Sequence, residues 1–160
     1  FGGRSGAVRE LLNLKGSLTP MTKLPFVTPI AIAAYQGHIE LLHALVQMGA
    51  QLTDASPQGV FQGATCVHAA AANESARMLH NLVNMKADVH CCIEANSFLK
   101  GATPLAAAAV FGRDEPISVL IAAGADVNST FGNWYLKGLS ALMIAAIFGQ
   151  EEAVYKLTEL

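Results

Sequence analysis

The sequence predicts an all-α solenoid built from stacked pairs of short helices. Two observations carry this prediction: a phrase of small residues recurs along the 160-residue chain, and an apolar helical pattern follows each copy. The phrase is clearest in "GATPLAAAAVFG" at 101–112, and variants of it occupy 27–37, 63–74 and 138–149. One such unit cannot bury its apolar side alone, so the units are expected to stack into an array.

The copies keep a regular spacing. Counted from the Thr or Ser that follows each glycine turn, the units recur after 37, 38 and 37 residues, and two alanines follow each anchor at the fifth and sixth positions. The anchors are Thr28, Thr65, Thr103 and Ser140. We therefore place the array at 24–160, with units starting near 24, 61, 99 and 136, and take 1–23 as a partial N-terminal repeat or cap.

The first helix of each unit has locally encoded ends. In the third unit, Thr103 is suited to capping free backbone N–H groups, and Pro104 is tolerated because the first helical turn needs no donor there. Alanine favours helix, and its small side chain lets neighbouring helices approach closely. Gly112 then supplies the left-handed residue of a tight turn.

A second apolar helical pattern follows each turn. Its segments read "IELLHALVQMGA", "ARMLHNLVNMKA", "PISVLIAAGA" and "EAVYKLTEL". Gly49 and Gly124 close two of these helices, whereas Lys86 stands at the corresponding corner of the second unit. Pro116 lies early in the third segment, where the first helical turn should accommodate it.

The repeated phrase resembles the ankyrin repeat, whose pattern runs Thr-Pro-Leu-His-x-Ala-Ala, then Gly-His, a Leu-rich helix and Gly-Ala-Asp-Val-Asn. The chain reads "TPIAIAA…GHIELLHALVQMGAQL", "TCVHAAA…ARMLHNLVNMKADVH", "TPLAAAA…GRDEPISVLIAAGADVN" and "SALMIAA…GQEEAVYKL". Four concordant copies make the resemblance specific. It implies a protein-binding module without a cofactor, and it implies that His68 bonds to the backbone between units.

The loops between units are longer than this family's period of about 33 residues requires. The excess lies in "TDASPQGVFQGA", "HCCIEANSFLKGA" and "NSTFGNWYLKGL". Because neighbouring residues of an extended strand face opposite ways, we expect one apolar row to be buried and the other to face solvent or a partner. The two rows are Val60, Phe98, Tyr135 and Phe61, Leu99, Leu136.

The resemblance places partner contacts at the hairpin tips and at the exposed end of each first helix. An apolar strip there indicates an interaction site, and Trp134 at a loop tip is a further anchor. The alternatives are that Trp134 covers the neighbouring hairpin and that the loops fold over Phe111 and Phe148. The predicted partner-binding residues are Tyr35, Phe61, Gln62, Asn73, Leu99, Lys100, Val110, Phe111, Trp134, Leu136, Lys137, Ile147 and Phe148.

Composition and motifs point away from other functions. A net charge of −2 gives no basic surface for nucleic acid, and no apolar run approaches the roughly 18 residues of a membrane helix. The "HCC" at 90–92 lacks a second Cys/His pair with zinc spacing, and no phosphate loop is present. We expect no enzyme activity, no catalytic, cofactor or metal site, no nucleic-acid or membrane partner, and a monomeric array that binds another protein.

Two alternative functions stay open from the sequence. The chain begins at Phe1 rather than Met, and 7–18 resembles the second half of a preceding unit. In the first alternative, the array is the docking or regulatory part of a larger multidomain enzyme, such as a bacterial effector acting in a host cell. The other alternative is a stand-alone inhibitor whose hairpins plug a partner enzyme. Three cysteines without a disulfide pattern favour an intracellular, reducing compartment.

Overall fold

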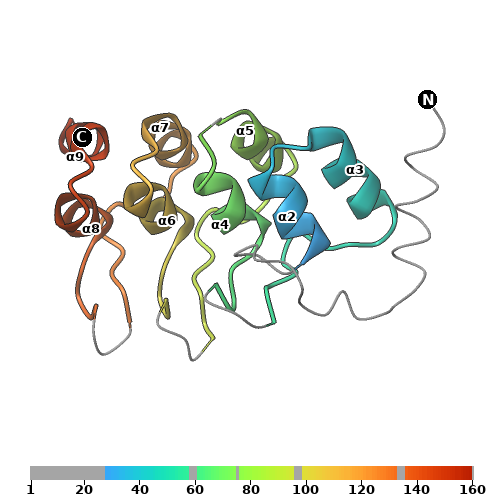
Figure 1. Cartoon of the computed structure of the whole chain (residues 1–160), viewed down its shortest axis with the longest axis horizontal. Coiled ribbons are helices and arrows are strands. Elements are labelled where there is room, and N and C mark those ends of the chain that lie inside the picture. Colours follow the sequence, from blue (N-terminus) through green and yellow to red (C-terminus); the bar gives the residue numbers. More distant parts are fainter. Residues whose placement is uncertain (1–27, 58–60, 75, 96–98, 133–135, 160) are drawn as a thin grey trace.

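The computed structural model describes residues 28–57, 61–74, 76–95, 99–132 and 136–159. In these residues the chain forms four pairs of antiparallel helices that lie side by side (Figure 1). The pairs are α2 (Pro29–Tyr35) with α3 (Ile39–Gln47), α4 (Cys66–Ala71) with α5 (Arg77–Asn84), α6 (Pro104–Val110) with α7 (Asp114–Ala122), and α8 (Ala141–Ile147) with α9 (Glu151–Thr158). The predicted all-α solenoid is confirmed.

The helices form two layers. The first helices of the units contact one another in the order α2, α4, α6, α8, and α7 of the second layer contacts both α5 and α9. The loops between units extend away from the helices on the side of the first layer (Figure 1). The surface between the loops and the first helices is therefore shared by consecutive units.

The helix starts follow the predicted capping. The side chain of Thr103 accepts a hydrogen bond from the Ala106 N–H at 3.2 Å, and Thr28 and Ser140 make the equivalent bond in their units. Thr65 instead shares a capping box with His68. Caps of this kind typically stabilise a helix by about 1 kcal/mol.

The turns also follow the sequence pattern. Gly49 and Gly124 have φ values of +100° and +89°, and Lys86 has a φ of 60°, so the lysine adopts the left-handed conformation that glycine supplies at this corner in the first and third units. Pro116 is buried in the first turn of α7, as expected. The second unit thus keeps the corner despite its non-glycine residue.

The alanine pairs pack the first layer. Seven of their eight residues are fully buried: Ala33, Ala34, Ala70, Ala71, Ala108, Ala109 and Ala145. Ala146 is exposed, because none of the described residues packs on that side of α8. Buried Leu and Ile side chains of the second layer complete the core, and each contributes on the order of 2 kcal/mol.

Side-chain donors connect consecutive units at the ends of the first helices. The carbonyl seven residues after each of the first three anchors accepts a hydrogen bond from the following unit, which satisfies an acceptor that the helix end leaves free. Arg113 also forms an ion pair with Glu74 at 3.0 Å. The bonds run from Asn73 to Tyr35, from Arg113 to Ala72 at 3.2 Å and from Gln150 to Val110 at 3.2 Å.

Each loop returns to the next helix through a β-turn. The Leu99 carbonyl accepts a hydrogen bond from the Ala102 N–H at 2.8 Å, and the turns at Phe61 and Leu136 have the same bond. Gly101 has a φ of +83°, which favours glycine at the third position of such a turn. A Cβ at Gly101 would lie only 2.3 Å from the Gly132 nitrogen, so the loops of the third and fourth units approach closely here.

Candidate functional site

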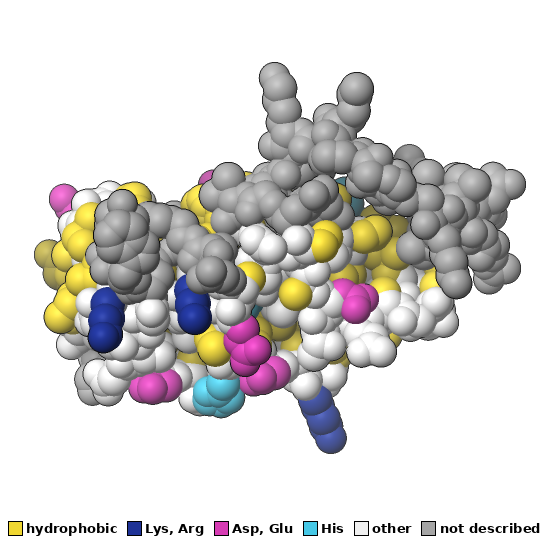
Figure 2. All heavy atoms as spheres, turned by 90° about the horizontal axis from the view of Figure 1, so that it is seen from below, with side chains coloured by type: hydrophobic (Ala, Val, Ile, Leu, Met, Phe, Trp, Pro, Cys, Tyr) yellow, Lys and Arg dark blue, Asp and Glu magenta, His cyan; other side chains and the backbone are white. Residues whose placement is uncertain are grey.

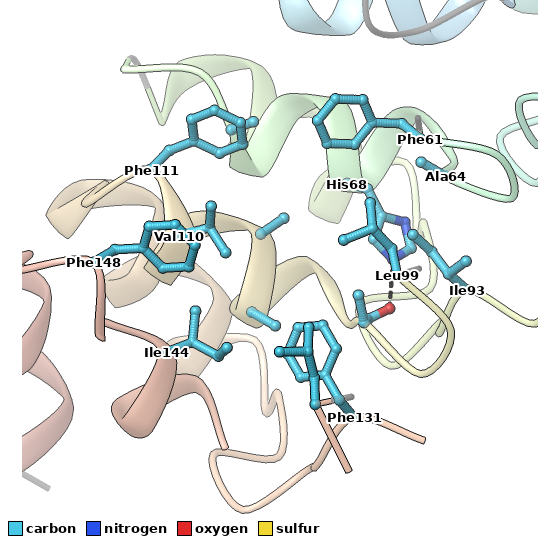
Figure 3. A pocket seen from close by; sticks show the side chains of 15 residues that line it. Phe61, Ala64, His68, Ile93, Leu99, Val110, Phe111, Phe131, Ile144 and Phe148 are labelled. Carbon is cyan, nitrogen blue, oxygen red and sulfur yellow. Dashed lines mark hydrogen bonds between the residues drawn. The ribbon is translucent and has the colours of Figure 1, made fainter. Parts of the chain in front are cut away.

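An apolar cavity of about 190 Å³ lies between the loops and the first helices of the second, third and fourth units (Figure 3). We call it the phenylalanine pocket, after the four phenylalanines that line it. The side chains that Figure 3 labels converge on the cavity from the loop turns and from the helix ends. The four are Phe61, Phe111, Phe131 and Phe148.

The loop turns supply one wall of the pocket. Phe61, Leu99 and Leu136 are the first residues of the three β-turns, and all three are half-buried against the core. They form one of the two apolar rows that the sequence predicts. The other row, Val60, Phe98 and Tyr135, lies outside the described residues.

The ends of two first helices supply another wall. Phe111 directly follows α6 and is half-buried, whereas Phe148 directly follows α8 and keeps 56 % of its surface exposed. Both side chains line the pocket. A large aromatic surface at the pocket therefore remains accessible.

The other predicted site residues lie around the pocket or away from it. Lys100 and Lys137 are exposed at the second position of their turns, and Gln62 holds the equivalent place in the second unit. Tyr35 and Asn73 are half-buried and join the first two units through their hydrogen bond. Ile147 is 62 % exposed and does not line the pocket. Trp134 lies outside the described residues.

The structure thus brings together part of the predicted set and adds residues that the sequence reasoning missed. The predicted residues that line the pocket are Phe61, Leu99, Val110, Phe111, Leu136 and Phe148. Ile93, Phe131 and Ile144 were not predicted. The signal for Ile93 and Phe131 is their equivalent place in the loops, where each pairs through its backbone with the residue before the anchor.

Comparison with known families agrees with the repeat fold. The family model "Ankyrin repeats (3 copies)" matches the chain over residues 30–131 and 67–160. The chain belongs to the ankyrin-repeat family. Ankyrin repeats are generally protein–protein interaction modules. A search of curated proteins returned no match.

The buried histidine of this ankyrin array has a structural role. His68 Nδ1 accepts a hydrogen bond from the Thr65 N–H at 3.3 Å, so the ring proton is on Nε2, which donates to the Ala102 carbonyl at 3.1 Å. Because Ala102 belongs to the following unit, the expected bond between units is confirmed. Burial lowers the pKa of His68 to about 4, which keeps the imidazole neutral near pH 7.

Two thiols of the ankyrin array, Cys66 and Cys91, are held in environments that favour the protonated form. Cys66 is buried and donates to the Leu52 carbonyl at 3.2 Å, and burial raises its pKa to about 12. Burial likewise raises the pKa of Cys91, whose sulfur lies 3.9 Å from His68 Nδ1. Since the thiolate is the reactive form, neither arrangement activates a nucleophile. Across the described ranges, no three His, Cys, Asp or Glu residues are grouped as a metal site would require.

The described helices are all short. None of them has the length and apolar character needed to cross a membrane.

Proposed function

We propose that this ankyrin array binds a partner protein through the phenylalanine pocket and the loop turns beside it. The observation that carries the proposal is the pocket itself: three consecutive units contribute apolar side chains to one accessible cavity. Apolar surface gathered at one site, rather than scattered singly, is typical of interaction sites.

The residue types at the pocket support a role in recognition. Aromatic residues, phenylalanine included, are enriched in protein interfaces. Truncating a residue that dominates an interface costs roughly 2 kcal/mol or more. Phe111 and Phe148 are accessible to different degrees, so one offers a partly buried wall and the other an exposed ring. Both rings lie at helix ends, and their backbones are fixed by the stacked first layer.

Binding is favoured over catalysis because His68 and Cys66, which could take part in acid–base or nucleophilic chemistry, serve the fold instead. His68 uses both ring nitrogens in hydrogen bonds. Cys66 donates to a backbone carbonyl, and burial holds its pKa far above neutral pH. We therefore propose a binding module without enzyme activity of its own.

We also propose an intracellular location. Cys66, Cys91 and Cys92 are all free thiols, and Cys92 is exposed. An exposed free thiol suits a reducing compartment, where disulfides rarely persist.

The experiment compares partner recovery by the wild-type chain and a Phe111→Ala, Phe148→Ala double variant, using quantitative pull-down from an extract of the source organism. The matched control is Tyr155→Ala, because Tyr155 is a large side chain on α9 that is 69 % exposed and does not line the pocket. We expect the double variant to lose at least about 90 % of a partner that the control retains, which corresponds to about 1.4 kcal/mol. Equal recovery by all three chains would remove the site assignment.

A further inference from the structure

We infer that the phenylalanine pocket receives one bulky apolar side chain from an acidic segment of the partner, and that carboxylates of this segment pair with Lys100 and Lys137. The inference rests on the proposed function and adds the chemistry of the segment that is bound. It follows from the size of the pocket, the lining of the pocket and the charges that directly follow lining residues.

The size of the pocket matches one large side chain. Its volume is about 190 Å³, whereas an apolar cavity of about 150 Å³ is enough to bind a benzene ring. The pocket therefore has room for a single Leu, Met or Phe side chain. It is too small to enclose a folded element of a partner.

The lining requires that this side chain be apolar. His68 is the one polar residue among those that line the pocket, and its two ring nitrogens are occupied by Thr65 and Ala102. A polar side chain that entered would lose its hydrogen bonds to water and find no replacement. The aromatic walls instead favour contact with an aliphatic or aromatic group.

Two exposed lysines directly follow residues that line the pocket. Lys100 directly follows Leu99, and Lys137 directly follows Leu136, so each lysine stands beside a residue that lines the cavity. Both lysines are exposed, and neither has an ion-pair partner among the described residues. Two basic side chains lie near one another on the loop side of the molecule, and acidic side chains lie close to one of them on the same face (Figure 2). The two lysines thus offer two cations to an incoming segment.

The lysines and the pocket have different effects on binding. Exposed ion pairs add little affinity, but they raise the association rate and select against partners of the wrong charge. The apolar side chain therefore provides the affinity, and the carboxylates provide the selection.

The test is a selection of displayed random 12-residue peptides on the full chain. Peptides that also bind an Ala107→Phe variant are discarded, because Ala107 lines the pocket and a larger side chain there would fill it. Phe148→Ala serves as a second pocket variant in case Ala107→Phe does not fold. The remaining peptides are expected to combine one bulky apolar residue with a roughly threefold excess of Asp and Glu.

Charge reversal gives the decisive comparison. On a Lys100→Glu, Lys137→Glu variant the flanking residues of selected peptides should change from acidic to basic. The control is Lys86→Glu, Lys156→Glu, which makes the same change in net charge at exposed positions that do not line the pocket. The control should keep the acidic preference.

The outcomes separate this inference from the proposed function. Pocket-dependent peptides with bulky apolar residues but no acidic excess would overturn the acidic segment and leave protein binding through the pocket intact. An unchanged preference on the charge-reversed variant would do the same. Selection of no pocket-dependent peptide would overturn the inference, and the pull-down would then decide the proposed function independently.

Discussion

The Nε2 atom of His68 donates a hydrogen bond to the carbonyl oxygen of Ala102, 3.1 Å away, and so joins the first helix of the second unit to the loop turn of the third. The same imidazole accepts the Thr65 N–H at 3.3 Å, which caps its own helix. One neutral ring therefore holds a helix start and a unit junction together.

This arrangement makes stability depend on pH. Burial lowers the pKa of His68 to about 4 in the folded chain, below the ordinary value of 6.5. Below pH 6.5 the unfolded chain therefore binds a proton that the folded chain does not, and stability falls as pH decreases toward 4. The loss should reach roughly 3 kcal/mol near pH 4, at about 1.4 kcal/mol per pKa unit.

Urea unfolding of the wild type and of His68→Asn between pH 7.5 and pH 4 measures this dependence, because carboxylates titrate equally in both chains. The difference between the two curves should shrink with acidity. His80→Asn, at an exposed histidine, is the control and should follow the wild type. A constant difference would show that His68 is not the titrating group.

Two loop glycines should respond differently to alanine. Gly101 and Gly138 have nearly equal φ values of +83° and +82°, but a Cβ at Gly101 meets Gly132 at 2.3 Å, whereas a Cβ at Gly138 meets nothing within 4 Å. We expect Gly138→Ala to cost about 1–2 kcal/mol from the left-handed backbone. Gly101→Ala should cost at least about 1 kcal/mol more. Chemical denaturation of both variants tests this, and equal losses would argue against a close approach of the loops.

Arg113 should matter more through its backbone contact than through its ion pair. Its Nε donates to the Ala72 carbonyl at 3.2 Å, while its Nη1 pairs with Glu74, whose side chain is 84 % exposed. Glu74→Ala should therefore cost less than about 0.5 kcal/mol, and Arg113→Ala about 1–2 kcal/mol. Thermal unfolding at low and high salt compares them. A strong salt dependence of the Arg113→Ala effect would assign the stabilisation to charge instead.

The three thiols should differ in reactivity. Cys92 is exposed, Cys91 is half-buried with a raised pKa, and Cys66 is buried with its pKa raised to about 12. A disulfide reagent at pH 8 should modify Cys92 first, Cys91 more slowly, and Cys66 only on unfolding. Cys92→Ser should remove the fast phase. Fast modification of Cys66 in the folded chain would contradict its burial.

Much of the fold could be predicted because its determinants are local. Thr103 caps its helix through a bond three residues away, and a turn such as that at Gly112 needs only one residue of positive φ. The burial of the alanine pairs could also be predicted, since the pairs recur in every unit and allow neighbouring helices to pack closely. These features repeat at a fixed spacing, so each copy supported the others.

The pocket was less predictable because its lining depends on contacts between units. Phe61, Leu99 and Leu136 could be found from their alignment on the loop glycines, but Phe131 lines the pocket only because the fourth unit's loop stacks beside the third. Ile147 was predicted as a partner-binding residue, and the structure places it outside the pocket lining. Its position resembles that of Val110, yet it lies on a side of α8 that no described residue covers.

The Gly132 amide donates a hydrogen bond of 3.1 Å to the Lys100 carbonyl, and this bond restrains the opening of the pocket. It links the turn that carries Leu99 to the loop that carries Phe131, so separating these two walls must break this bond. Hydrogen–deuterium exchange at Gly132 would then report the opening of the two walls. A ligand held between the two walls should slow that exchange without touching Gly132 itself.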